Sequence, residues 1–282
     1  MEIILGTAQL NRPYGLIDTV SNKTSFRDPS ELIELAKRTS LAGVDTAPVY
    51  GDSEVLLGRA GMNIPLHTKL RQDCSVNQSI EQSKRNLRVD FLPLVYIHQE
   101  LTGHAAQRSV IQQLRARPDV GEIGASIYSQ EELNLAVNDD DISVIQLPYN
   151  VLDRRFSAGN LRLARSRGKK IFGRSALLQG LLTESFILPQ PLNASLMPYV
   201  SAFRSASSSL GVTSLVAAIA FASRNSNLSA LVIGAKSRAQ LAEIVAAQTV
   251  PIPEGLLEEL DVLRVPAPDT VDPRNWSVLG LH

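Results

Sequence analysis

Ile3-Ile4-Leu5-Gly6-Thr7-Ala8-Gln9 is a short apolar run that ends in a single glycine, and it decides between two folds. The run predicts a buried strand over Ile3–Ala8. In an open, doubly wound sheet with a dinucleotide site, a strand in this place leads into the pattern G-x-G-x-x-G. In this sequence Gly6 is the only glycine of that pattern. The sequence therefore favours a closed barrel and leaves an open sheet as the alternative.

Further apolar runs follow along the chain, and amphipathic patterns lie between them. The other predicted strands are Gly43–Thr46, Pro65–Lys69, Phe91–His98, Gly121–Ser126, Ser143–Leu147, Lys170–Arg174 and Ala230–Gly234. The predicted helices are Pro29–Leu41, Ser75–Leu87, Ala105–Arg115, Gln130–Val137, Ala158–Arg167, Ser195–Leu210 and Ser237–Ala247. Such alternation is typical of a parallel sheet covered by helices. We predict an α/β fold, a (β/α)8 TIM barrel, with its active site at the C-terminal ends of the strands.

The last part of the chain, Pro251 to His282, differs in composition from the rest. It has one short helical pattern, Glu254–Leu263, then several prolines and the only tryptophan, Trp276. No repeat or linker divides the remaining sequence, so we predict a single domain over residues 1–282. The tail is either disordered or folded across the barrel mouth. We expect it to contribute to the substrate pocket there, with Trp276 as an aromatic wall.

The composition excludes several classes of protein. The chain has 282 residues, with 28 basic and 28 acidic side chains, so its charge gives no reason to expect a nucleic acid or an anionic membrane as partner. Its start lacks the regions of a signal peptide, and no segment reaches the roughly 18 apolar residues of a membrane span. Cys74 is the only cysteine, which excludes an intramolecular disulfide. We expect a cytoplasmic protein.

Polar side chains gather where the predicted strands end. Asp45 closes the second strand and Tyr50 follows it five residues later, while Lys69 and His98 close the third and fourth strands. Because parallel strands of a barrel end at one mouth, we expect these four side chains to lie together. Later strand ends add further polar residues to the same mouth, namely Ser126, Gln146, Arg174 and Ser175.

This group suits proton transfer to a carbonyl oxygen. A free tyrosine has a pKa near 10, and an adjacent lysine ammonium lowers the pKa by stabilising the phenolate. A carboxylate such as Asp45 keeps the buried lysine charged. A histidine across the pocket hydrogen-bonds the substrate oxygen. Each residue alone has an ordinary alternative: Asp45 as a helix cap, Lys69 on the surface, His98 in the core and Tyr50 packed on the rim.

A metal-dependent hydrolase is a weaker alternative for a barrel of this kind. Such an enzyme needs several histidine and carboxylate ligands at strand ends. The chain has four histidines, and His67, His104 and His282 do not fall at predicted strand ends. We therefore predict no metal site.

The sequence resembles the aldo-keto reductase superfamily, in particular its bacterial NAD(P)H-dependent members. The longest match is the pattern G-x-D-T-A-x-x-Y-G-x-S-E-x-x-L-G, present at every fixed position as Gly43-Val44-Asp45-Thr46-Ala47-Pro48-Val49-Tyr50-Gly51-Asp52-Ser53-Glu54-Val55-Leu56-Leu57-Gly58. Shorter matches are Gly6-Thr7, Thr68-Lys69, Val95–His98, Gly124–Ser126, Gln146–Asn150 and Ser175–Leu182. The resemblance extends from about Ile3 to Ala247.

The resemblance implies a role for each residue. Tyr50 is the general acid, Lys69 with Asp45 tunes its pKa, and His98 orients the substrate carbonyl. Ser126 and Gln146 hold the nicotinamide carboxamide, Gly6 and Thr7 lie near the ring, and Ser175 and Leu177 approach the pyrophosphate. Arg174 stands where many relatives stack an aromatic ring on the nicotinamide. The adenosine site is implied to include Gly234, Lys236, Ser237, Arg238, Gln240 and Glu243.

The segment after the last predicted strand bears on the cofactor. Lys236, Ser237 and Arg238 precede a helix, and a helix N-terminus with added cations attracts a phosphate such as the 2′-phosphate of NADP. A solvated helix cap is the alternative. Where NADP-specific relatives often have an arginine the chain has Gln240, and Ile244 replaces an asparagine that contacts adenine. Ile127 likewise replaces an asparagine at the carboxamide. We expect NADPH or NADP as cofactor, with NADH also possible.

The expected function is reduction of an aldehyde or ketone on a small polar molecule, sugars among them. An NAD(P)+-dependent sugar lactol dehydrogenase is an alternative, because the same four residues serve both directions. A cofactor-sensing regulatory subunit with little turnover is another alternative, although fold is a poor guide to function. We expect a small-molecule substrate as the only partner, and a monomer or a weak homo-oligomer.

Overall fold

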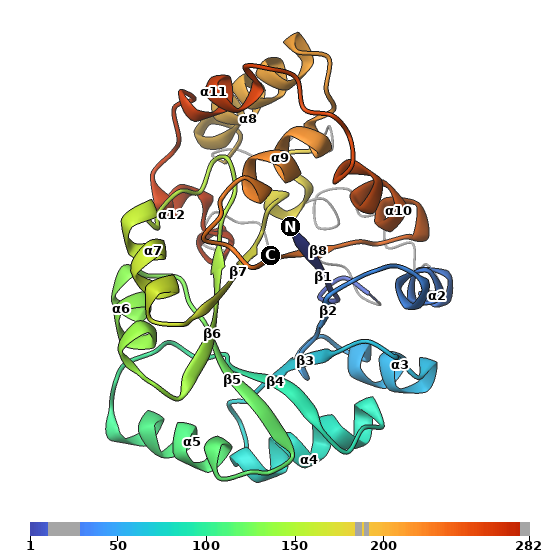
Figure 1. Ribbon diagram of the computed structural model, residues 1–282, viewed down its shortest axis with the longest axis vertical. Helices are drawn as coiled ribbons and strands as arrows, with labels where there is room; N and C mark the ends of the chain where they lie inside the picture. The colour runs from blue at the N-terminus through green and yellow to red at the C-terminus, as the bar shows by residue number, and fades with distance from the viewer. Residues whose placement is uncertain (11–28, 184–187, 189–191, 277–282) are drawn as a thin grey trace.

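The computed structural model describes residues 1–10, 29–183, 188 and 192–276. The eight predicted strands close into one parallel barrel in sequence order, and β8 pairs with β1 (Figure 1). The strands are β1 (Glu2–Gly6), β2 (Gly43–Asp45), β3 (Leu66–Lys69), β4 (Leu92–Ile97), β5 (Val120–Ser126), β6 (Ile142–Pro148), β7 (Lys170–Arg174) and β8 (Ala230–Gly234). The closed barrel is thus confirmed, and the alternative of an open sheet was wrong.

Helices surround the barrel. Those described are α2 (Ser30–Arg38), α3 (Ser53–Ala60), α4 (Val76–Leu87), α5 (Ala105–Arg115), α6 (Gln130–Asn138), α7 (Ala158–Ser166), α8 (Leu192–Ser209), α9 (Ser214–Ser223), α10 (Arg238–Ala247), α11 (Leu256–Asp261) and α12 (Pro268–Val271). Two 3₁₀ turns are η1 (Leu178–Gly180) and η2 (Pro273–Asn275). Side-chain caps begin several helices, since the hydroxyl oxygens of Ser75 and Ser129 each accept a bond from the third residue of the helix.

The sequence pattern does not predict α3 and α9. Helix α9 is apolar on nearly every side, so it lacks the helical period that marks a surface helix. Its apolar residues are buried because it contacts α8, α10 and α11. Thr213 caps its start, where the hydroxyl oxygen accepts a bond from the N–H of Val216.

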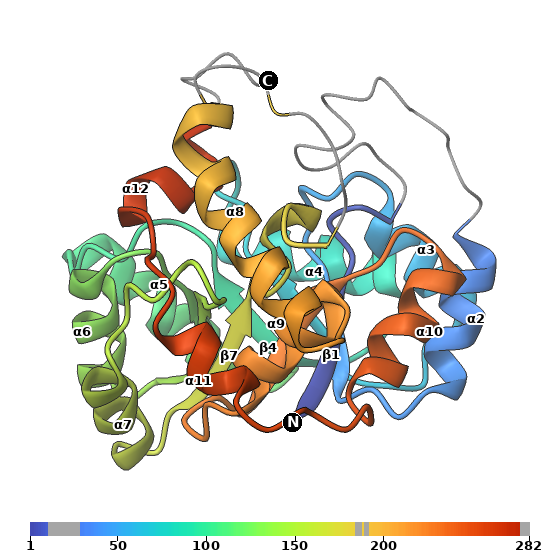
Figure 2. The ribbon, with the colours of Figure 1, turned by 90° about the horizontal axis from the view of Figure 1, so that it is seen from above.

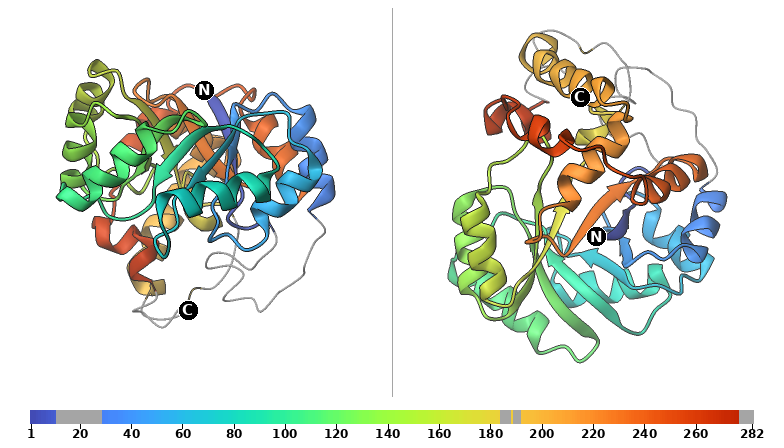
Figure 3. Two further views of the ribbon diagram at one scale, coloured as in Figure 1. Left: turned by 90° about the horizontal axis from the view of Figure 1, so that it is seen from below. Right: turned by 45° about the horizontal axis from the view of Figure 1, so that its top comes forward.

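Three apolar clusters hold the molecule together. One fills the space between strands and helices, and another fills the barrel itself with Ile4, Leu94, Tyr96, Val144, Phe172, Ala230 and Val232. Gly124 makes room inside the barrel, because a Cβ there would lie 2.5 Å from the ring of Tyr96. The third cluster lies beside the barrel and joins α8, α9 and α11, which contact one another (Figure 3).

The described part of the tail packs against that third cluster. Trp276 is 1% exposed, and its indole N–H donates to the backbone oxygen of Thr270 at 2.9 Å. It fills the core beside the barrel and is not the aromatic pocket wall that we expected. Helices α8 and α12 reach toward the end of the barrel opposite the N-terminus (Figure 2). One residue of the tail, Arg274, contacts Tyr128, which follows the C-terminal end of β5 at the barrel mouth. The guanidinium carbon of Arg274 is 3.5 Å from the centroid of the Tyr128 ring.

No single helix in the described ranges is long and apolar enough to cross a membrane. Only α8 and α9 together reach that length and composition, and they meet at a 97° bend.

Candidate active site

The four predicted catalytic residues lie at neighbouring strand ends. Asp45 is the last residue of β2 and Lys69 the last of β3, while His98 directly follows β4. Tyr50 lies in the loop that connects β2 to α3. The closed barrel brings these C-terminal ends to one mouth, as the sequence predicts.

Asp45 and Lys69 form a buried ion pair. The Lys69 Nζ atom is 2.5 Å from Asp45 Oδ1, and the two side chains are 2% and 5% exposed. Lys69 also donates to the backbone oxygen of Thr46 at 2.9 Å, and Asp45 Oδ2 accepts from Gln146 Nε2 at 2.8 Å. A buried ion pair is stable only when its remaining donors and acceptors are also satisfied. Here the surrounding groups fix both charges in place.

Two tyrosines lie near the Lys69 ammonium. Its Nζ is 5.0 Å from the ring centroid of Tyr50 and 5.4 Å from that of Tyr96. Burial raises the pKa of Tyr96 well above its usual value, so this phenol does not give up its proton near neutral pH. Tyr50 is half-buried and lines a cavity. Tyr50 is therefore the phenol that combines a nearby cation with access from outside.

His98 is half-buried and electrically neutral. Burial, followed by the positive charge of Lys69, lowers the pKa of His98 from 6.5 to about 4. A neutral imidazole donates one hydrogen bond and accepts another. His98 lines a separate hollow with Pro48 and Val49, whereas Asp45 and Tyr50 line another cavity.

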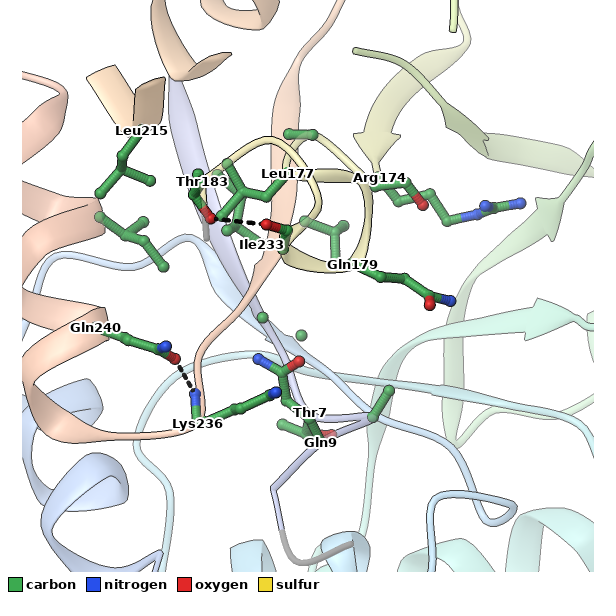
Figure 4. A pocket seen from close by; sticks show the side chains of 18 of the residues that line it. Thr7, Gln9, Arg174, Leu177, Gln179, Thr183, Leu215, Ile233, Lys236 and Gln240 are labelled. Atoms are coloured by element: carbon green, nitrogen blue, oxygen red, sulfur yellow. Dashed lines mark hydrogen bonds between the residues drawn. The ribbon is translucent and has the colours of Figure 1, made fainter. Parts of the chain in front are cut away.

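The cavity that Asp45 and Tyr50 line extends across the barrel mouth to the first turns of α10. Figure 4 shows part of its wall, with Thr7, Arg174, Lys236 and Gln240 around it. Its wall is built from the residues after β1, β7 and β8 together with the start of α9. Most of the predicted cofactor residues lie on this wall, namely Gly6, Thr7, Gln146, Arg174, Ser175, Leu177, Gly234, Lys236, Gln240 and Glu243.

Three predicted cofactor residues lie off the cavity wall. Ser126 is buried, and its hydroxyl lies 3.4 Å from Gln146 Oε1, so it contacts the cavity only through Gln146. The Ser237 hydroxyl oxygen accepts from the N–H of Gln240 as the cap of α10. Arg238 is exposed on that helix. The positions of Ser237 and Arg238 therefore agree with the alternative interpretation, in which this segment is a solvated helix cap.

The model of the Aldo/keto reductase family matches residues 2–264, nearly the whole chain. The chain belongs to the aldo/keto reductase family. It is 25% identical over 183 residues to the NADH-specific methylglyoxal reductase of Escherichia coli (strain K12). That match covers 52% of this chain and 56% of the relative, so the chain spans little more than half of the relative's length.

Solved aldo/keto reductases have the same fold. The holo form of aldo-keto reductase AKR11C1 from Bacillus halodurans superimposes with a TM-score of 0.75 at 18% identity, covering 94% of both chains. The glycerol dehydrogenase AKR11B4 from Gluconobacter oxydans gives a TM-score of 0.72 at 20% identity and covers 93% of this chain and 90% of its own. At these identities the likeness shows the fold alone.

Several polar residues on the cavity wall of this aldo/keto reductase are not predicted from the sequence. They lie in the turn after β1, in the segment after β7 and at the start of α9, namely Gln9, Gln179, Thr183, Thr213 and Ser214. Thr213 was detectable in principle, because a threonine before an apolar run is a helix-start signal. Gln9 and Thr183 lie in turns, Gln179 lies in η1 and Ser214 begins α9, and the placement of these segments at the cavity depends on the folded barrel.

Two glycines on the cavity wall let neighbouring protein groups pack closely. A Cβ on Gly234 would lie 2.8 Å from the Gln9 side-chain nitrogen, and one on Gly6 would lie 3.3 Å from Val232. The capped N-terminus of α10 and the nearby Lys236 add positive charge at the far end. These residues fit a nicotinamide dinucleotide, the cofactor type of aldo/keto reductases.

The segment after β7 has a strained backbone. Ser175, Leu178 and Gln179 have φ values of 59°, 46° and 54°, in the left-handed region that favours glycine. The Ser175 oxygen accepts from the side-chain amide of Asn150 at 3.0 Å, and Gly180 N donates to Leu177 O at 2.9 Å. Strain of this kind persists where the surroundings hold it, often at binding sites.

Within the described residues, no group of three or more His, Cys, Asp or Glu side chains is arranged to hold a metal ion.

Proposed function

We propose that this aldo/keto reductase is an NAD(P)H-dependent oxidoreductase that reduces aldehyde or ketone carbonyls of small polar molecules to alcohols. One observation carries the proposal: the buried Asp45–Lys69 pair lies beside Tyr50, with the ammonium 5.0 Å from its ring centroid. Tyr50 lines the same cavity as the residues that fit a dinucleotide. A proton donor and a hydride carrier thus meet at one place.

Tyr50 donates its phenolic proton to the carbonyl oxygen. Lys69 stabilises the resulting phenolate, and Asp45 keeps Lys69 charged in its buried position. The neutral His98 donates a hydrogen bond that orients the carbonyl oxygen. The cofactor supplies the hydride when it is bound. The reverse direction, oxidation of an alcohol or lactol with NAD(P)+, uses the same residues with the proton moving to Tyr50.

Two charged residues of opposite sign on the cavity wall bear on the choice between NADPH and NADH. Lys236 attracts a 2′-phosphate, whereas the exposed carboxylate of Glu243 repels it. Since Ser237 and Arg238 lie off the wall, Lys236 is the residue of this segment that could bind a phosphate in the cavity. We propose that both cofactors are accepted. The NADH specificity in the name of the Escherichia coli relative agrees with use of the unphosphorylated form.

The test follows loss of reduced-nicotinamide absorbance with NADPH and NADH against aldehydes, ketones and open-chain sugars. Tyr50→Phe is compared with Tyr199→Phe, a half-buried tyrosine on α8. We expect turnover of at least one substrate and a loss of about a hundredfold or more in Tyr50→Phe only. Equal rates in the Tyr50 variant and the wild type would refute its role. Tight cofactor binding without turnover would instead favour a cofactor-sensing subunit.

A further inference from the structure

Arg174 places a positive charge in the wall of the cavity that also contains Tyr50. It is the last residue of β7, and its side chain lines the cavity. In Figure 4 the Arg174 side chain points away from Lys236 and Gln240, which mark the α10 end. Arg174 therefore shares a cavity with Asp45 and Tyr50, and its charge points away from the proposed adenosine site.

Tyr128 holds this guanidinium in a fixed position. The guanidinium carbon of Arg174 is 3.9 Å from the Tyr128 ring centroid, and that of Arg274 is 3.5 Å from it. Two guanidinium groups cannot occupy the same space over one ring, so they stack on opposite faces. Arg174 also donates to the backbone oxygen of Ile127 at 3.0 Å. A stacked and hydrogen-bonded guanidinium loses little further freedom when it binds an anion.

The carboxylates of this region are engaged by other groups. Asp153 binds Arg155 through two bonds of 2.9 Å, and Asp272 binds Arg155 at 3.0 Å and Arg274 at 2.7 Å. Glu132 accepts backbone N–H bonds at the start of α6, among them that of Tyr128 at 2.7 Å.

Arg174 differs from its neighbours. Within the described ranges, no carboxylate lies within 4.0 Å of Arg174, and one of its five N–H donors has an acceptor, the oxygen of Ile127. A guanidinium that lines a cavity and forms no salt bridge there has donors available for an anionic ligand.

We propose that Arg174 binds an anionic group of the substrate, a carboxylate or a phosphate, so that the substrate is a small aldehyde or ketone that carries a negative charge. This inference rests on the proposed reductase function and narrows its substrate class. Planar guanidinium matches both anions through paired N–H donors. Burial and the charge of Lys69 lower the pKa of His98 most, and the positive charge of Arg174 adds to this lowering.

Anion binding is measured without turnover, by titrating inorganic phosphate and, separately, acetate into the protein in a calorimeter. The matched variants are Arg174→Gln and Lys236→Gln, which each remove one cation from the cavity wall. For acetate we expect one site per chain whose affinity falls about tenfold or more in Arg174→Gln and less than twofold in Lys236→Gln, whereas phosphate, which Lys236 also attracts, should bind more weakly in both variants. Arg174→Lys keeps the positive charge but lacks the paired N–H donors of a guanidinium, so it should bind the anion with intermediate affinity. Loss in Lys236→Gln alone, or no binding to the wild type, overturns the inference.

Turnover separates this inference from the proposed function. The substrates are matched pairs: 4-carboxybenzaldehyde with its methyl ester, and glyceraldehyde 3-phosphate with glyceraldehyde. We expect the charged member of at least one pair to have the lower KM, and Arg174→Gln to raise the KM of the charged member about tenfold more than the KM of the neutral member. Arg108→Gln, on the exposed face of α5, should change neither. Turnover of both members without charge preference refutes the anion site alone; anion binding without any turnover refutes the reductase alone.

Discussion

Gln146 and Asp45 connect opposite parts of the barrel mouth, since Gln146 Nε2 donates to Asp45 Oδ2 at 2.8 Å although the residues are 101 positions apart. Gln146 lies on β6 and Asp45 on β2. The second oxygen of Asp45 is bound by Lys69, so one carboxylate gathers residues from three strands. The residue implied to hold the nicotinamide carboxamide thereby also orients the carboxylate of the proton-transfer group.

The Asp45–Lys69 pair should be coupled in stability as well as in function. Asp45→Asn leaves the buried Lys69 ammonium without a carboxylate, and we expect the free energy of unfolding to fall by about 3–5 kcal/mol. The double variant Asp45→Asn/Lys69→Met should lose less, because no buried charge remains. Lys170→Met breaks an exposed pair with Glu122 and should cost at most about 1 kcal/mol. Urea unfolding measures all three; a double variant that is the least stable would contradict the coupling.

Two glycines should respond to alanine with opposite signs. A Cβ on Gly124 would lie 2.5 Å from the Tyr96 ring inside the barrel, where the ring cannot move aside, so Gly124→Ala should cost about 1–3 kcal/mol. Gly159 lies in α7 with its nearest neighbour 3.7 Å from the added Cβ, so Gly159→Ala should gain about 0.5–1 kcal/mol. Thermal unfolding of the two variants checks the signs, and a destabilised Gly159→Ala would show that helix propensity does not control that position.

The strands and the positions of the candidate catalytic residues were predictable because both depend on local patterns. A short apolar run that ends in a polar residue marks a buried parallel strand, and the barrel geometry then places Asp45, Lys69 and His98 at one mouth. These positions can be predicted from the strands alone, without knowing how the loops fold.

Other features depend on tertiary packing and were not predictable. Helix α9 lacks an amphipathic period because neighbouring helices cover it, and Trp276 is buried by α8 and α11 rather than by the barrel mouth. Gln9 lies in the turn after β1 and Gln179 lies in η1, and no local pattern predicts that these segments line the cavity. The stacking of Arg174 and Arg274 on Tyr128 joins residues far apart in sequence, which no local pattern reveals.

Acid should weaken the fold through its buried histidines. Burial lowers the pKa of both His67 and His98 to about 4, whereas an unfolded histidine has a pKa near 6.5. Between these values the unfolded chain binds protons that the folded chain does not, so stability falls as the pH drops from 6.5 to 4. Removing one histidine should reduce that loss by up to about 3 kcal/mol. Urea unfolding of His67→Gln across this range should show the smaller slope, while the exposed His104→Gln keeps the wild-type slope.

Cofactor preference should follow the charges near α10. Removing the negative charge with Glu243→Gln should lower the Kd for NADPH about three- to tenfold while leaving that for NADH nearly unchanged, because only NADPH carries the 2′-phosphate. Lys236→Gln should act in the opposite direction by a similar factor. Both effects should shrink at high ionic strength, since these side chains are at least partly exposed. Equilibrium titration of each reduced cofactor provides the measurement, with Glu254→Gln, outside the cavity wall, as the control. Equal shifts for NADPH and NADH in either variant would show that Glu243 and Lys236 do not contact the adenosine 2′ position.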